Sequence, residues 1–331
     1  MKQKKNLNLI RDTARAFQRS RILLTAAELD VFTAVAKGAD TPKKLTRRLK
    51  CGERPVTMLL RALAGMGLLA KSGGRYRVND AAKALVDDGR SVGRKALLHT
   101  ASGWERWSRM TEAIRKGKLE ARRKDRKRWR DHFIAAMEQA STMRAAPAAR
   151  AMKGVLRRSS TLLDLGGGSG GYAPAFLEQN PDLSITIFDQ KEVLPLTRKY
   201  LAASSRTKGR VKLAAGDFLA DDIGKGFDIV FLSSIIHIYG SRTNMRLMKK
   251  IFRALSPGGS IVISDFILDD NEHTPVDAAI FGLHMLVSTG EGGTYTRGEI
   301  RGWMKKAGFR AIRVIDVKGR ALLMAGRKPM N

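Results

Sequence analysis

The chain has 331 residues, 43% of them apolar, which is enough to bury one large hydrophobic core or two ordinary ones. Lysine and arginine number 62 against 31 acidic residues, and a formal net charge of +31 bears on binding partners rather than on the fold. A single cysteine, Cys51, excludes an internal disulfide and a thiolate metal cluster, and no apolar stretch approaches the roughly 20 residues of a membrane span, so we expect a soluble, cytoplasmic protein.

The N-terminal part of the chain predicts three helices followed by a hairpin. Apolar residues recur at helical spacing in a first segment, which breaks between Gly38 and Pro42. These apolar residues are Ile22, Leu23, Ala26, Leu29, Val31, Phe32 and Val35. Thr41 can cap a short second helix, Pro55 to Leu69 predicts a third, and Ser72 to Gly74 supplies the turn of a basic hairpin. This order is typical of a winged helix-turn-helix.

Residues 94–156 form a second helical zone, in which Trp104, Trp107, Trp129, Phe133 and Met137 stand among polar positions. From Thr161 onwards, short apolar runs alternate with helical stretches, which is typical of a parallel sheet flanked by helices. Seven strands are predicted, at Thr161 to Leu165, Ser184 to Phe188, Val211 to Ala215, Phe227 to Leu232, Ser260 to Asp265, Ala311 to Val317 and Ala321 to Gly326. We therefore expect a helical domain over 1–100, a helical connector over 101–156 and a Rossmann-like, doubly wound α/β domain over 157–331.

A glycine loop at the end of the first predicted strand is the strongest chemical signal. The segment Leu162 to Gly171 reads LLDLGGGSGG and runs into a predicted helix at Tyr172 to Gln179. Glycine lets the backbone turn tightly and approach a ligand closely, and ligands bind at this edge of such sheets. Asp189 closes the next strand, about 20 residues after the loop, where a carboxylate can accept both hydroxyls of a ribose. Together these features predict a nucleoside-type cofactor.

The same loop and acid could serve NAD, because they also form the dinucleotide-binding pattern. The context favours a different cofactor. The α/β domain begins near residue 160 and leaves no following substrate domain, and Asp217-Phe218 after the third strand suits an adenine ring.

Several motifs resemble those of class I S-adenosylmethionine-dependent methyltransferases: LDLGGGSG, the acid at Asp189 and GDF at Asp217. The 26–78 segment and the stretches FLSSIIHIYG, SPGGSIVISDF and YTRGEIRGWMKKAGF are similar, more particularly, to plant caffeate-type and bacterial polyketide-type O-methyltransferases. The resemblance spans nearly the whole chain. It implies the cofactor S-adenosyl-L-methionine, the product S-adenosyl-L-homocysteine, a small phenolic, polyketide or pigment-like acceptor, and no metal. It also implies a homodimer, because the winged-helix domain serves dimerisation in this family.

The resemblance also implies roles for particular residues. The cofactor-binding positions it implies are Asp164, Gly166, Gly168, Gly170, Asp189, Asp217, Phe218 and Ser233. The glycines would line the methionine and ribose portions of the cofactor, Asp189 would hold the ribose, and Asp217 with Phe218 would hold the adenine. Phe133 and Met137 match an element that packs near cofactor and substrate, and Asp265 is a candidate to bind substrate or orient a base.

The general base is where the sequence departs from the caffeate-type pattern. The position that holds the basic histidine in those enzymes is Ser288 here, and a serine hydroxyl is a poor base. Loss of a base could cost about 10²–10⁴-fold in rate. His237, after the fourth strand, and His284, one helical turn before Ser288, remain as candidates. An acceptor that is already ionised would tolerate the serine.

Three alternatives remain open at this stage. The acceptor atom could be carbon or nitrogen on a pigment or quinone precursor. The basic run Arg122 to Arg130 and the winged helix suggest a non-catalytic nucleic-acid-binding protein, although the motifs of base-modifying methyltransferases are absent from the sequence. The same basic run could instead touch an anionic membrane surface peripherally.

Overall fold

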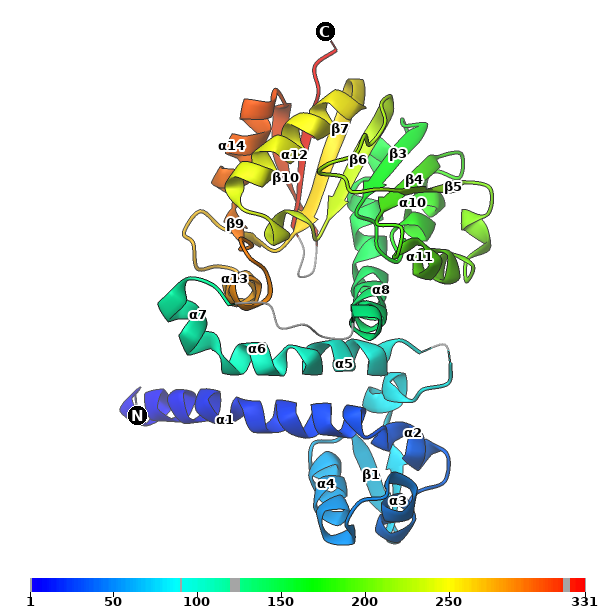
Figure 1. Cartoon of the computed structure of the whole chain (residues 1–331), viewed down its shortest axis with the longest axis vertical. Helices are drawn as coiled ribbons and strands as arrows, with labels where there is room; N and C mark the ends of the chain where they lie inside the picture. Colours follow the sequence, from blue (N-terminus) through cyan, green and yellow to red (C-terminus); the bar gives the residue numbers. More distant parts are fainter. Residues whose placement is uncertain (1, 90, 120–125, 318–321, 331) are drawn as a thin grey trace. The chain divides into compact units, whose positions relative to one another are not determined.

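The computed structural model describes residues 2–89, 91–119, 126–317 and 322–330 (Figure 1). Part of the basic run Arg122 to Arg130 and the first residue of the predicted strand at Ala321 lie outside the described residues. The chain divides into two compact units, Met1–Ser102 and Gly103–Asn331. No helix among the described residues combines the length and the apolar character needed to cross a bilayer.

The first unit contains the predicted helices and hairpin. Its elements are α1 (Lys2–Glu28), α2 (Val31–Ala36), α3 (Pro42–Leu49), α4 (Glu53–Gly65), β1 (Leu69–Ser72), β2 (Arg75–Val78), the 3-10 helix η1 (Asp80–Leu85) and α5 (Gly93–Ser102). As predicted, Thr41 caps α3: its hydroxyl accepts a hydrogen bond from the Lys44 backbone N–H at 3.3 Å. Phe32, Leu60 and Tyr76 bury their side chains in one core, which holds the helices against the hairpin.

Two sequence predictions in this unit are wrong in detail. The segment Ile22 to Val35 is not one helix, because Asp30 adopts a left-handed conformation, with φ of 57°, that ends α1 and lets α2 begin. Apolar residues on both sides of this break are buried, so their spacing alone does not reveal it. The third helix ends at Gly65 rather than Leu69, since Leu69 begins the first strand of the hairpin.

The second unit contains a helical segment followed by an α/β domain. Its helices are α6 (Trp104–Ser108), α7 (Met110–Lys116), α8 (Arg126–Ala151), α9 (Lys153–Leu156), α10 (Ala173–Gln179), α11 (Leu194–Leu201), η2 (Ser205–Thr207), η3 (Ile236–Ile238), α12 (Ser241–Ala254), α13 (Val276–Ser288) and α14 (Arg297–Ala307). Its strands are β3 (Thr161–Leu165), β4 (Ser184–Asp189), β5 (Val211–Ala215), β6 (Phe227–Ser233), β7 (Leu255–Asp265), β8 (Ile267–Leu268), β9 (Tyr295–Thr296), β10 (Arg310–Asp316) and β11 (Leu322–Arg327). β8 and β9 form a short parallel pair that the sequence did not predict.

All seven predicted strands join one sheet, in the order β10-β11-β7-β6-β3-β4-β5. The expectation of a fully parallel sheet is wrong for one strand, because β11 runs antiparallel to both of its neighbours, β7 and β10. The connection between β10 and β11 is too short for the helical crossover that parallel neighbours require. The fold is therefore a Rossmann-like, seven-stranded mixed sheet, preceded in the chain by a helical N-terminal domain.

Alternate residues of the central strands pack on opposite faces of the sheet. In β6, Ile229 and Phe231 belong to the core that α8 and α10 cover, whereas Val230 and Leu232 belong to the core under α12 and α14 (Figure 1). A strand buried on both faces has no polar face, which explains the continuous apolar run in the sequence.

The order of the strands determines where a ligand can bind. The chain moves outwards from β3 through β4 to β5, and then returns to the other side of β3 with β6 and β7. Crevices in open α/β sheets form outside the carboxyl ends of the strands where the order reverses, which is here between β3 and β6. Gly166 follows the end of β3, and Ser233 is the last residue of β6, so both lie at this crevice.

Candidate active site

The glycine loop after β3 needs glycine for conformation and for space. Gly166, Gly168 and Gly170 all have positive φ, at 73°, 56° and 77°. A Cβ on Gly166 would lie 2.5 Å from Cδ1 of Ile235, and one on Gly170 would lie 2.9 Å from Cδ1 of Ile187. Any larger side chain would therefore strain the backbone and displace the wall of the crevice.

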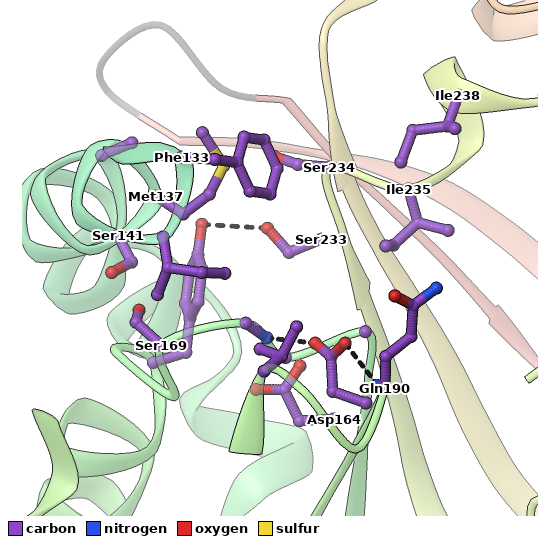
Figure 2. A pocket seen from close by; sticks show the side chains of 18 of the residues that line it. Phe133, Met137, Ser141, Asp164, Ser169, Gln190, Ser233, Ser234, Ile235 and Ile238 are labelled. Carbon is purple, nitrogen blue, oxygen red and sulfur yellow. Dashed lines mark hydrogen bonds between the residues drawn. The ribbon is translucent and has the colours of Figure 1, made fainter. Parts of the chain in front are cut away.

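Asp189, the last residue of β4, holds this loop in place. Its Oδ2 accepts a hydrogen bond from the Gly168 N–H at 2.8 Å, and its Oδ1 accepts one from the Gln190 N–H at 2.7 Å (Figure 2). Burial raises the pKa of the Asp189 carboxyl, while these two backbone donors oppose the rise. Each carboxylate oxygen keeps a further lone pair for a ligand hydroxyl.

Asp164, in β3, is a buried carboxyl without a partner on one oxygen. It is 2% exposed, and its Oδ2 has no hydrogen-bond partner among the described residues. Burial, and then the neighbouring charge of Asp189, raise its pKa to about 7. An unpartnered buried oxygen at a cavity wall fits a ligand that brings a positive charge or an N–H donor.

A cavity of about 780 Å³ lies over the glycine loop. Eight of the residues predicted for the site line it: Phe133, Met137, Asp164, Gly166, Gly168, Asp189, Phe218 and Ser233. Six others do not line it: Gly170, Asp217, His237, Asp265, His284 and Ser288. Figure 2 shows Phe133 and Met137 on α8 facing Ser233, with Asp164 on the floor of the cavity.

Of the adjacent residues Asp217 and Phe218, only Phe218 lines the cavity. The Asp217 side chain closes a turn, because its Oδ1 accepts a hydrogen bond from the Leu219 N–H at 2.8 Å. Phe218 lines the cavity and packs edge-on against Tyr239, with ring centres 6.0 Å apart. The aromatic member of this predicted pair thus offers a surface to a ligand ring, while the acid organises the turn behind it.

The end of β6 supplies polar groups to the opposite wall. The Ser233 hydroxyl donates to the Tyr172 hydroxyl at 3.2 Å, and both residues line the cavity. Ser234 also lines it and has φ of 58°, a left-handed conformation that a non-glycine residue adopts at a cost. Its backbone N–H donates to the Ser264 carbonyl at 2.9 Å, which holds the conformation.

His237 and Asp265 form a buried pair. Nδ1 of His237 lies 2.6 Å from Oδ1 of Asp265, and the two residues are 7% and 3% exposed. The same Oδ1 accepts the Phe266 N–H at 2.8 Å. Because a carboxylate accepts hydrogen bonds, Nδ1 carries a proton toward Asp265, and in the neutral ring the free lone pair is then on Nε2.

His284, in α13, has the opposite arrangement. Its Nδ1 accepts a hydrogen bond from Nε1 of Trp107 at 3.0 Å, and an indole N–H can only donate. Burial lowers the pKa of His284, and the charge of Arg106 lowers it further, so the ring is neutral and carries its proton on Nε2. The Phe281 ring lies between the two histidines, at 4.9 Å from His237 and 5.6 Å from His284.

Ser288 ends α13, and its hydroxyl is buried without a hydrogen-bond partner in the described part of the chain. No described side chain is therefore positioned to take its proton. Within 2–89, 91–119, 126–317 and 322–330, no group of three or more histidine, cysteine, aspartate or glutamate side chains could hold a metal ion.

Several lining residues were not predicted from the sequence, among them Tyr172, Gln190 and Arg144. Two had a usable signal, because Tyr172 directly follows the glycine run and Gln190 directly follows Asp189. Arg144 had none, since it is one of many basic residues and only the packing of α8 brings it to the cavity.

Known proteins resemble this chain over nearly its whole length. The profile of the O-methyltransferase domain matches residues 105–310, and that of the O-methyltransferase dimerisation domain matches residues 12–88. The 3-hydroxy-5-methyl-1-naphthoate 3-O-methyltransferase of Streptomyces sahachiroi is 33% identical over 93% of this chain and 90% of its own. The tetracenomycin polyketide synthesis 8-O-methyl transferase TcmO of Streptomyces glaucescens is 31% identical over 95% of this chain and 94% of its own.

Solved structures share the fold of this chain. Human N-acetylserotonin methyltransferase in complex with SAM has the same fold, with a TM-score of 0.86, 22% identity and 98% of each chain covered. An O-methyltransferase family protein from Burkholderia thailandensis has a TM-score of 0.83 at 27% identity, again with 98% of each chain covered. The chain belongs to the O-methyltransferase family, and it is a methyltransferase whose cofactor is S-adenosylmethionine.

Proposed function

We propose that the enzyme methylates a hydroxyl group on a small aromatic acceptor of the naphthoate or polyketide type. One observation carries this proposal: a single cavity joins the glycine loop and Asp189 to an aromatic wall on α8. In that wall Trp129 and Phe133 stack with ring centres 5.1 Å apart, and Met137 lies beside them. Such a surface suits a flat ring system. Both relatives described above that exceed 30% identity are named for aromatic or polyketide O-methylation.

The cofactor would lie over the glycine loop. Gly166 and Gly168 allow close approach of the backbone, Asp189 would accept the ribose hydroxyls, and Phe218 would pack against the adenine. Asp164 would face the positively charged portion of the cofactor through its unpartnered oxygen. When bound, the cofactor supplies a methyl group on a positively charged sulfur. The protein's task is then to orient the acceptor oxygen, to remove its proton and to exclude water.

His237 is the proton acceptor in this proposal. It does not itself line the cavity, but its ring lies 6.3 Å from that of Phe266, on which Arg144 of the cavity wall lies. A phenol such as tyrosine has a pKa near 10, so methylation at neutral pH benefits from a positioned base. Asp265 fixes the proton of His237 on Nδ1 and leaves Nε2 able to accept. His284 cannot do the same while Trp107 donates to its Nδ1, and it would instead donate a hydrogen bond through Nε2. The Ser288 hydroxyl has no role in proton removal.

A titration with S-adenosylmethionine and S-adenosylhomocysteine, followed by calorimetry, tests the cofactor site. We expect Asp189→Asn to weaken both ligands strongly, whereas Asp182→Asn, an exposed carboxylate that pairs with Arg210, should bind like the wild type. The loaded wild type should then methylate a panel of hydroxylated naphthoates and polyketide aromatics. Binding that Asp189→Asn leaves intact would contradict the site, and a panel without any methylated product would contradict the acceptor class.

A nitrogen acceptor is the second candidate. The N,N-dimethyltransferase OxyT of Streptomyces rimosus is 28% identical over 94% of this chain, so a sequence of this type is compatible with amine methylation. Mass spectrometry of products from paired aromatic amines and phenols distinguishes the two. If the acceptor is an amine, replacement of His237 should change kcat little, because a neutral amine attacks without prior loss of a proton.

The enzyme would act as a homodimer through its N-terminal domain. The matched dimerisation domain covers residues 12–88, and α1 exposes Leu7, Ile10 and Phe17, which are 62%, 66% and 55% accessible. Their spacing places them along one side of the helix, and such a stripe of large apolar side chains is typical of an interface. A cytoplasmic location is part of the proposal, and the single free Cys51 is compatible with a reducing compartment.

A further inference from the structure

A guanidinium group lies on the wall of the cavity at its aromatic end. Arg144 extends from α8, is partly buried and lines the cavity. Its guanidinium carbon is 4.9 Å from the centre of the Phe266 ring. Phe266 follows Asp265 directly in the chain and stacks on Phe281, with ring centres 3.9 Å apart. Arg144 and His237 thus both lie near the Phe266 ring, at 4.9 Å and 6.3 Å from its centre.

Arg144 forms no ion pair in the described part of the chain, where no acidic oxygen lies within 4 Å of its guanidinium. Asp265 directly precedes Phe266. Its Oδ1 bonds His237 and the Phe266 N–H, and its Oδ2 is buried without a hydrogen-bond partner among the described residues. Burial raises the pKa of Tyr172, and the positive charge of Arg144 opposes that rise, which places the charge near the Tyr172 hydroxyl in the cavity. A partly desolvated cation without a counter-charge favours a ligand that brings one.

Arg106, in α6, carries a second partly buried guanidinium. Its Nε is buried without a hydrogen-bond partner in the described part of the chain. Its charge lowers the pKa of His284 after the larger effect of burial, so it lies close to that ring. Arg144 lines the cavity and lies on the Phe266 ring, whereas Arg106 does not line the cavity.

We infer that the acceptor carries a carboxylate and that Arg144 binds it. The inference rests on the proposed function, since it concerns the acceptor of that same site. A planar guanidinium can donate two parallel N–H bonds to a carboxylate while its face stays on an aromatic ring, as the Arg144 guanidinium lies on Phe266. The acceptor class is therefore a hydroxylated aromatic acid, and its neutral counterparts are poorer substrates.

The test uses two probes that differ only in the acid group. 3-Hydroxy-1-naphthoate and 2-naphthol present the same hydroxyl, but only the first has a carboxylate. Binding to the full-length protein saturated with S-adenosylhomocysteine is measured by calorimetry, and methylation with S-adenosylmethionine gives kcat and KM. The variants are Arg144→Gln, Arg144→Lys and, as a matched control on the same helix, the exposed Arg150→Gln.

We expect the wild type to bind the acid at least about tenfold more tightly than the naphthol, which is the low end for a hydrogen-bonded charge pair. Arg144→Gln should lose about 10- to 100-fold in affinity for the acid and change little for 2-naphthol. Its effect should fall on KM more than on kcat. Arg144→Lys should recover part of the affinity, because it keeps the charge without the planar fork, and Arg150→Gln should match the wild type.

Three outcomes would overturn the inference. The first is equal or undetectable binding of the two probes to the wild type. The second is an equal loss for both probes in Arg144→Gln. The third is a loss of S-adenosylhomocysteine affinity in Arg144→Gln, because it would assign the guanidinium to the carboxylate of the cofactor. Tight binding of the acid without methylation of its hydroxyl would support the Arg144 subsite and count against the proposed hydroxyl acceptor, so the two failures can be told apart.

Discussion

Oδ1 of Asp265 lies 2.6 Å from Nδ1 of His237, and both side chains are buried at the carboxyl end of the sheet. This carboxylate decides which ring nitrogen of His237 carries the proton. Asp265→Asn should therefore lower kcat by about 10²–10⁴-fold, the usual contribution of a positioned base, and leave S-adenosylhomocysteine binding unchanged. Initial rates and calorimetry check this. His273→Gln, an exposed histidine, is the control, and a kcat for Asp265→Asn within threefold of the wild type would show that the pair is not catalytic.

The hydrogen bond from Trp107 to His284 can be tested by NMR. Ring ¹⁵N shifts of His284 should report a neutral ring protonated at Nε2 at pH 7, because Trp107 occupies Nδ1 and burial lowers the pKa. Trp107→Phe should release that constraint and let both tautomers appear. His284→Gln should reduce kcat far less than His237→Gln does. A His284 ring found protonated on Nδ1 would reverse the roles assigned to the two histidines.

Asp164 couples cofactor binding to pH. Its pKa is about 7 in the free protein because of burial and the nearby Asp189, and a positively charged ligand favours the ionised form. Affinity for S-adenosylmethionine should therefore fall as pH decreases below 7, by up to about tenfold per unit, and level off above 8. Calorimetry in buffers of different ionisation enthalpy should detect proton release at pH 6.5. Asp164→Asn should abolish that release; a release that persists in this variant would assign it to another group.

Alanine substitutions at two glycines with similar backbone angles can distinguish backbone strain from an effect on cofactor binding. Gly166 and Gly226 have φ of 73° and 83°, so alanine at either position should cost roughly 1–2 kcal/mol of stability. The two differ in the space around them, because a Cβ on Gly166 would meet Cδ1 of Ile235 at 2.5 Å, whereas one on Gly226 would find nothing within 4 Å. Thermal unfolding should show a loss for both variants, larger for Gly166→Ala because of the contact with Ile235, but only Gly166→Ala should lose cofactor affinity. Equal affinities would remove the loop from the cofactor site.

The apolar stripe on α1 predicts the oligomeric state. Replacing Leu7, Ile10 and Phe17 together by serine should convert a dimer into a monomer, as measured by light scattering after size exclusion. Circular dichroism provides the control for folding, since none of the three side chains is buried within its own chain. A wild type that is already monomeric at micromolar concentration would contradict the proposal.

Most of the fold could be predicted from local patterns. Each predicted strand is a short apolar run between turn residues, and a strand buried on both faces, such as 227–233, leaves little other interpretation. The left-handed Asp30 was not predictable, because a one-residue break preserves the helical spacing on either side of it. β11 runs antiparallel to its neighbours because only a short connection separates it from β10. The apolar pattern predicts the strand but not its direction.

The site was predictable only where its residues adjoin a motif. Asp189 and Phe218 follow strand ends, so their place in the chain predicts their place at the crevice. Arg144 and Trp107 lie on helices whose packing is set by long-range contacts, and their sequence neighbours give no sign of a cavity or of a histidine partner. Asp217 belongs to a correctly predicted motif but does not line the cavity. A motif does not specify which of two adjacent side chains faces the cavity.

The reversed strand β11 also affects the order in which the enzyme can be built. β11 is the last strand in the chain, yet it lies inside the sheet between β7 and β10, and its residue Leu322 pairs with Asp265. During synthesis, the glycine loop and Asp189 can come together long before this strand exists. The edge of β7 that carries Asp265 stays unpaired until β11 has been synthesised. The segments that form the glycine loop and Asp189 thus precede, by more than 130 residues, the strand that pairs beside Asp265.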